Sequence, residues 1–77
     1  MNKSRRARIT KLQHQISDLL CDLNEIHDEE EQAYYNLPES IQDSERGEAM
    51  SEAFENLYEA ISMLEDVSSY LDDAKGE

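Results

Sequence analysis

Apolar residues in the first half of the chain recur with alternating spacings of three and four. The series consists of Ile9, Leu12, Ile16, Leu19, Leu23 and Ile26. This spacing is typical of an a/d heptad pattern, in which one stripe of an α-helix packs against another helix. A further row, Leu20, His27 and Tyr34, lies beside the stripe and widens it. We therefore predict a first helix over about residues 5–35, packed through the six residues of the series.

The second half repeats the seven-residue period with a wider apolar stripe. Its three neighbouring rows are Met50, Leu57, Leu64 and Leu71; Ala53, Ala60, Val67 and Ala74; and Phe54 with Ile61. Three rows cover more of a helix than one facing helix can bury, and small residues allow a neighbour to approach closely. We expect a second helix over about residues 44–74 that contacts the first helix and also something else.

The intervening residues 36–43 carry turn and capping signals. Pro38 biases Leu37 away from helical dihedral angles, so the first helix should end nearby. Asp43 or Ser44 can accept hydrogen bonds from the first free N–H groups of the second helix. Two helices of equal length with a short link predict an all-α fold, a coiled-coil-like antiparallel two-helix hairpin that forms one domain over residues 1–77.

A hairpin of 77 residues has a small core. Domains below about 70–80 residues usually need a disulfide, a metal or an oligomeric partner for stability. The single cysteine, Cys21, cannot form an internal disulfide. Together with the wide stripe on the second helix, this predicts a homodimer in which two hairpins form a four-helix bundle.

The chain is strongly acidic, with 19 Asp and Glu against 7 Lys and Arg and a net charge of -12. Nucleic acids and anionic membranes repel such a chain, so we expect neither as a direct ligand. A protein partner with a basic surface is favoured instead. Five of the seven bases fall in the first eleven residues, which leaves two interpretations open. They pair with acids at the end of the second helix, or they form a basic arm that contacts nucleic acid or an acidic groove.

Acidic residues form two lines at helical spacing. One line comprises Glu45, Glu48, Glu52, Glu55 and Glu59, and the other Asp18, Asp22, Glu25 and Glu29. Each line places a carboxylate about every 5 Å, a separation comparable to that of duplex phosphates. The lines are either the solvated faces of amphipathic helices or a mimic of nucleic acid. A solvated helix face usually mixes charge signs, but between residues 12 and 74 only Arg46 interrupts the negative charge, so mimicry stays open.

The sequence offers no constellation for catalysis, so we expect no enzyme, no catalytic residues, no cofactor and no metal ligands. Neither His14 nor His27 follows an acid by three residues, as a metal site in a helical bundle requires. No glycine-rich phosphate loop is present. Because no apolar run is long enough for a membrane span and no signal peptide is evident, we expect a cytoplasmic protein.

The segment from 34 to 50 reads Tyr-Tyr-Asn-Leu-Pro-Glu-Ser-Ile-Gln-Asp-Ser-Glu-Arg-Gly-Glu-Ala-Met. It resembles a motif of small, uncharacterised acidic helical proteins of bacteriophages and mobile elements, in which an Asn-x-Pro-Glu-Ser turn precedes Ser-Glu-Arg-Gly. The likeness covers the middle third of the chain, and the flanking helices by composition alone. It implies a phage or prophage origin and a bacterial host cell, and it carries no activity.

Three functions are consistent with these features. The first is an accessory protein that binds and modulates a host protein, the second an acidic mimic that inhibits a DNA- or RNA-binding defence or regulatory protein, and the third a structural or assembly component of a virion. Neighbouring tyrosines cannot both face the other helix, so at least one of Tyr34 and Tyr35 should be exposed. The candidate partner-binding residues are Glu45, Glu48, Glu52, Glu55, Glu59, Tyr34, Tyr35 and Arg46.

Overall fold

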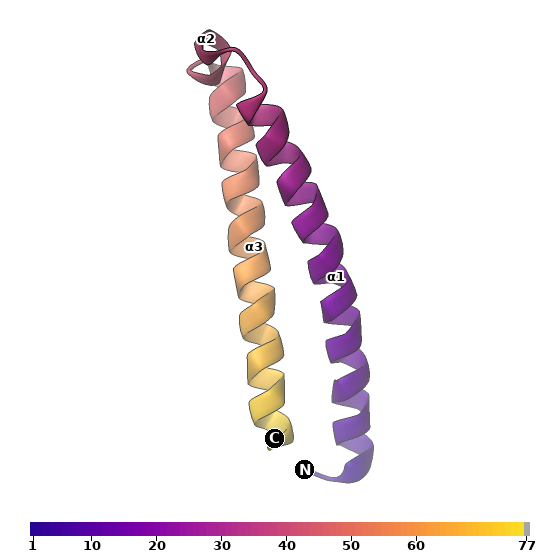
Figure 1. Cartoon of the computed structure of the whole chain (residues 1–77). Coiled ribbons are helices and arrows are strands. Elements are labelled where there is room, and N and C mark those ends of the chain that lie inside the picture. The colour runs from indigo at the N-terminus through magenta and orange to yellow at the C-terminus, as the bar shows by residue number, and fades with distance from the viewer. Residues whose placement is uncertain (77) are drawn as a thin grey trace.

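The computed structural model describes residues 1–76 and is a long helical hairpin. It contains α1 (Lys3–Tyr35), α2 (Glu39–Gln42) and α3 (Glu45–Lys75). Helices α1 and α3 run antiparallel side by side, α2 lies at the tip, and the two chain ends lie together at the open end (Figure 1). The rod measures 58 × 15 × 14 Å between Cα atoms. The predicted all-α hairpin is confirmed.

Capping residues set the ends of both long helices. Asn2 accepts a 2.9 Å hydrogen bond from the Arg5 N–H, which starts α1 two residues before the predicted position. Of the two predicted caps for the second helix, Ser44 is the one that acts, accepting from the Gly47 N–H at 3.4 Å. Helix α3 ends at Gly76, whose left-handed backbone (φ 77°) suits glycine.

The link between the long helices is a compact turn built around α2. The Gln42 side-chain amide donates to the carbonyls of Tyr34 and Leu37, at 3.3 and 3.0 Å, and so ties the link to the end of α1. On the other side, a Cβ at Gly47 would overlap the backbone carbonyls of Ile41 and Gln42. The glycine therefore allows the link to pack against the start of α3.

Helix α1 buries a different pair of rows from the pair that the heptad spacing predicts. The partly buried positions along the contact are Ile9, Gln13, Ile16, Leu20, Leu23, His27, Glu30 and Tyr34. Leu12, Leu19 and Ile26, predicted to pack against the second helix, are instead 50%, 53% and 50% exposed. The prediction was wrong by one row, because the row that begins at Gln13 replaces the row that begins at Leu12.

Contacts at both ends of the hairpin explain this rotation. Near the open end, Gln13 Nε2 donates to the Ser68 carbonyl at 3.1 Å and to Asp72 Oδ1 at 2.7 Å. Near the tip, the rings of His27 and Tyr34 lie 6.1 and 5.5 Å from the Phe54 ring. A helix in a two-helix pair buries only about two neighbouring rows. Because these three α1 residues share one row, their contacts turn that row inward.

The core between the helices is thin. Helix α3 faces α1 with Met50, Phe54, Leu57, Ile61, Leu64, Ser68 and Leu71. Among residues 1–76, Ile61 is the only buried hydrophobic residue, at 6% exposure. At the open end Lys75 lies across the contact, with Nζ 3.1 Å from Thr10 Oγ1 and 3.9 Å from Asp72 Oδ1. Its aliphatic stem covers apolar surface there while its amine keeps polar partners.

The central position of Ile61 leads to a first prediction. Ile61→Ala should lower the free energy of unfolding by about 2–4 kcal/mol, because it removes buried methyl groups and leaves a cavity. Glu59→Ala, on the exposed outer side of α3, should change it by less than about 0.5 kcal/mol. Urea denaturation followed by circular dichroism measures both. Equal effects of the two variants would contradict the assignment of the core.

Gly47 gives a second prediction, in which sterics and helix propensity oppose each other. Alanine normally stabilises a helix interior by about 1 kcal/mol over glycine. At this position the added Cβ meets backbone carbonyls that cannot rotate away. Gly47→Ala should therefore lower the melting temperature, and a rise would show that the link does not pack against α3 in this way.

Candidate interaction surfaces

One flank of the hairpin is mainly apolar, and we call it the apolar face. Its members from α1 are Leu12, Leu19 and Ile26, and those from α3 are Ala53, Ala60, Met63, Val67, Tyr70 and Ala74. Each residue of the rows that begin at Leu12 and at Ala53 comes one position before a residue that faces the other long helix. In an antiparallel pair of right-handed helices, two such rows lie on the same side.

The apolar face is open to solvent. Met63 and Tyr70 are 65% and 74% exposed, Val67 is 45% exposed, and the three α1 members are half exposed. The chain as a whole exposes 5845 Å². A folded monomer of 8.9 kDa typically exposes about 4,800 Å² by the usual scaling with mass. The three apolar rows of the second helix indicated such a surface in the sequence. The α1 residues of the apolar face were instead predicted to pack in the core.

The opposite flank is mainly polar and holds a shallow groove. His27, Glu31, Phe54 and Tyr58 line it. His27 Nδ1 lies 3.1 Å from Asp28 Oδ1, and its Nε2 lies 3.9 Å from Glu31 Oε2. Across residues 1–76, no three His, Cys, Asp or Glu side chains are grouped so that they could hold a metal ion. The groove therefore provides aromatic packing around a histidine and no constellation of metal ligands.

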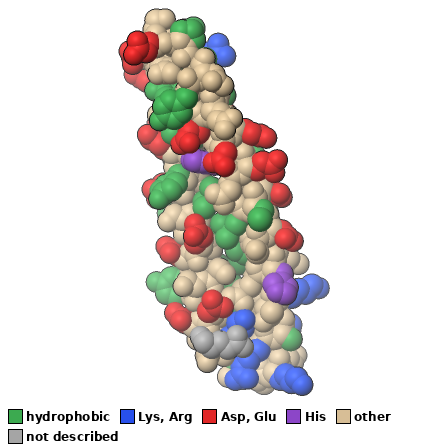
Figure 2. All heavy atoms as spheres, viewed as in Figure 1, with side chains coloured by type: hydrophobic (Ala, Val, Ile, Leu, Met, Phe, Trp, Pro, Cys, Tyr) green, Lys and Arg blue, Asp and Glu red, His purple; other side chains and the backbone are tan. Residues whose placement is uncertain are grey.

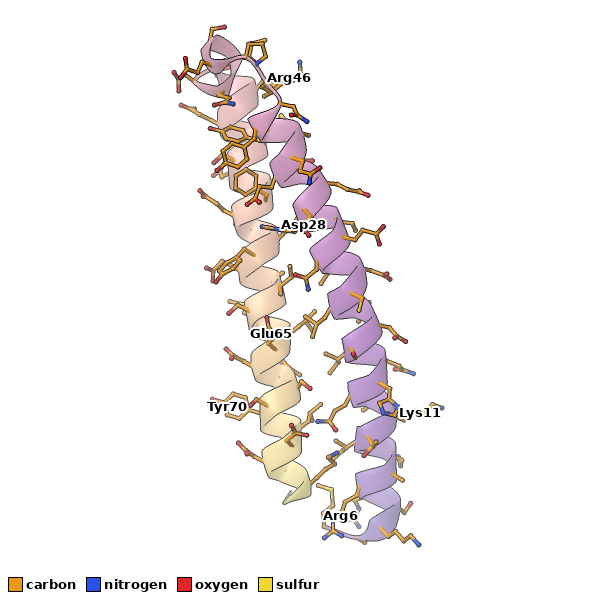
Figure 3. All side chains as sticks on the ribbon, viewed as in Figure 1. Arg6, Lys11, Asp28, Arg46, Glu65 and Tyr70 are labelled. Carbon is orange, nitrogen blue, oxygen red and sulfur yellow. The ribbon has the colours of Figure 1, made fainter. Side chains whose placement is uncertain are left out.

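The two acidic lines run along opposite outer edges of the hairpin. All five glutamates from Glu45 to Glu59 are exposed on α3, and all four acids from Asp18 to Glu29 are exposed on α1. Lys11, seven residues before Asp18 in the same row, points away from α3 (Figure 3). The lines thus face away from each other and form two separate surfaces. Figure 2 shows acidic side chains along both helices and basic side chains gathered at the open end.

The tip presents two further accessible candidate residues. Tyr34 is partly buried, with its ring 5.5 Å from the Phe54 ring. Tyr35 is 65% exposed, with its ring 5.2 Å from the Tyr34 ring and 6.4 Å from the Phe54 ring. This agrees with the prediction that at least one of the two tyrosines is exposed. Arg46 is also exposed and lies at the tip (Figure 3). The predicted binding residues are therefore accessible except Tyr34, which is mainly a packing residue.

The basic residues at the start of α1 make no direct ion pairs with α3. They are Lys3, Arg5, Arg6, Arg8 and Lys11, and all are exposed. Within residues 1–76, the ion pairs shorter than 4.0 Å are those of His27 and the pair of Lys75 with Asp72. Contact at the open end is made instead through Thr10, Gln13 and Lys75. The cluster is therefore left facing solvent.

No protein-family model, curated protein or solved structure matches this chain. In the part of the chain that the structure describes, neither long helix has an apolar stretch that could cross a membrane. The surfaces must therefore be interpreted from their own chemistry: one apolar flank, two acidic edges and a basic open end.

The neighbouring tyrosines give a third prediction. Tyr34→Ala should lower the free energy of unfolding by about 2–4 kcal/mol, because its ring packs against Phe54. Tyr35→Ala should cost less than about 1 kcal/mol, because most of its side chain is in solvent. Thermal unfolding of the two variants measures the difference. A larger loss for Tyr35→Ala would reverse the roles assigned to the two rings.

Proposed function

We propose that this chain is a non-catalytic accessory protein of a phage or mobile element that binds and modulates a host protein through its helical surfaces. It acts in the host cytoplasm as a homodimeric four-helix bundle. The phage origin rests on the resemblance of residues 34–50. The observation that carries the binding role is the exposed line of five glutamates on α3, which begins at the tip, where Tyr35 and Arg46 are also exposed.

The glutamate line suits a basic protein surface. Glu45 and Glu59 are fourteen residues apart, so the line is about 21 Å long. Within residues 1–76 none of its glutamates takes part in an ion pair, and Glu55 accepts one weak hydrogen bond from Ser51 at 3.5 Å. These carboxylates are therefore available to lysine and arginine side chains of a partner. Such contacts guide association and weaken as salt screens them.

Nucleic-acid mimicry is the second candidate, favoured by the placement of the acidic lines on opposite edges of one rod. A duplex also presents phosphates along both sides. Under this alternative the partner is a DNA- or RNA-binding protein, and the hairpin occupies its basic groove. Competition separates the two candidates: duplex DNA or RNA should displace the hairpin from a mimicry target and leave another partner bound.

The fourth prediction concerns the α3 edge. The purified chain, immobilised and exposed to a bacterial host lysate, should retain a partner at low salt and lose it at high salt. The variant Glu48→Lys, Glu52→Lys, Glu55→Lys should lose at least about 90% of that binding, because it reverses the charge at the centre of the glutamate line. Circular dichroism should show the helicity unchanged, since all three residues are exposed.

A matched variant controls for net charge. Asp18→Lys, Glu25→Lys, Glu65→Lys makes the same change in net charge at exposed positions away from the glutamate line. It should retain most of the binding. Equal loss of binding in both variants would show that only net charge matters. Undiminished binding by the Glu48→Lys, Glu52→Lys, Glu55→Lys variant would exclude the α3 edge as the binding surface.

A further inference from the structure

We propose that the apolar face binds the same face of a second copy, with the two hairpins antiparallel so that the tip of one lies beside the open end of the other. This rests on the homodimer of the proposed function and assigns its surface and its orientation. Helix α1 then packs against α1 of the second copy, and α3 against α3. The twofold axis lies in the interface, perpendicular to the helices, at the middle of the apolar face.

The hairpin needs such a covering. Its buried hydrophobic core, over residues 1–76, consists of Ile61, and no large side chain is fully buried there. Six large hydrophobic residues on the apolar face are at least 45% exposed. An isolated pair of helices of this size gains little stability from its own contact. A second apolar face of the same length would bury these six side chains from both copies.

The positions of the apolar residues suit a twofold axis. The contacts of Gln13 with Ser68 and of His27 with Phe54 set the helices in register, and they place Leu19 about level with Ser62. Leu19 is also the midpoint of the α1 row, and the α3 row from Ala53 to Ala74 is centred within two residues of the same level. Rotation about that level therefore superposes the apolar face on itself. Leu19 meets Leu19 of the second copy, and Leu12 meets its Ile26.

Charge selects the antiparallel orientation. The row of α1 that borders the apolar face comprises Arg8, Gln15, Asp22 and Glu29, all exposed. In the antiparallel dimer Arg8 lies beside Glu29 of the second copy, and Gln15 beside its Asp22. In a parallel twofold dimer α1 would instead pack against α3 of the second copy, so Arg8 would not meet Glu29.

On α3 the bordering row is complementary in the same way. Asn56 and Tyr70 are both exposed and lie equally far from the centre of the row, on either side of Met63. The twofold axis therefore places the Tyr70 hydroxyl near the Asn56 amide of the second copy. Tyrosine commonly serves in interfaces because its ring is buried while its hydroxyl keeps a polar partner.

Sedimentation velocity of the full chain tests the assigned surface. The wild type should be a dimer at micromolar concentration. Leu19→Glu should raise the dimer dissociation constant at least about 100-fold, because two carboxylates would be buried at the axis. Ser17→Glu, an exposed position on the opposite flank of α1, should leave it within about threefold. A helical wild-type monomer, or equal effects of both substitutions, would overturn the proposal.

A charge exchange tests the orientation. Arg8→Glu and Glu29→Arg should each weaken the dimer, and the double variant should restore the wild-type dissociation constant to within about threefold. The two positions are 21 residues apart on one helix, about 31 Å, so rescue cannot arise within one chain. Failure of rescue would overturn the antiparallel arrangement.

These measurements use the purified chain alone and are independent of the lysate binding described above. A monomer that still binds a host protein through the α3 edge would refute the dimer and preserve the partner-binding role. A dimer that binds no host protein would refute the partner-binding role and preserve the dimer.

Discussion

The rotation of α1 about its own axis determines which surfaces this hairpin presents. Three apolar or aromatic rows compete for the contact with α3, and a two-helix pair can bury only about two of them. The row of Gln13, Leu20, His27 and Tyr34 occupies the contact through hydrogen bonds at one end and ring contacts at the other. Leu12, Leu19 and Ile26 are consequently placed beside the small residues of α3, and the apolar face is formed.

The same rotation distributes the charges. With the apolar face on one flank, the acidic lines fall on the two outer edges, and the row from Arg8 to Glu29 borders the apolar face. The basic cluster finds no ion-pair partner on α3 within the described residues, although the antiparallel fold brings it near Asp72 and Asp73. In the proposed dimer, a second, antiparallel copy would supply acids beside Arg8 and cover the apolar face at once. One arrangement thus accounts for two features that the single hairpin leaves unexplained.

Much of the fold could be predicted from the sequence because its signals are local. Heptad spacing, Pro38 and the capping residue Ser44 place the helices within two residues of the observed bounds. The choice between the rows of Leu12 and Gln13 could not be predicted in this way. It depends on contacts between residues 27 and 59 positions apart, such as His27 with Phe54 and Gln13 with Asp72. Hydrophobicity alone favours the row with three aliphatic residues.

The candidate site was predictable to a similar degree. Exposure of the glutamate line followed from helical periodicity, since the line lies opposite the rows that face α1. The roles of Tyr34 and Tyr35 did not, because which tyrosine packs depends on the rotation of α1 against Phe54. The role of Gly47 could not be predicted either, because it depends on the path of the link. The carbonyls of the link occupy the space that a side chain at this position would need.

The proposed dimer also changes the surface available to a host protein. An antiparallel twofold arrangement brings the two α3 helices together on one side of the bundle and the two α1 helices on the other. The glutamate lines of both copies then lie on the same side, running in opposite directions, with a Tyr35 and an Arg46 at each end. A symmetric acidic surface of this kind suits a basic partner that is itself twofold symmetric. Each glutamate line then meets an equivalent basic surface on the partner, so dimerisation doubles the charge contacts without any new residue.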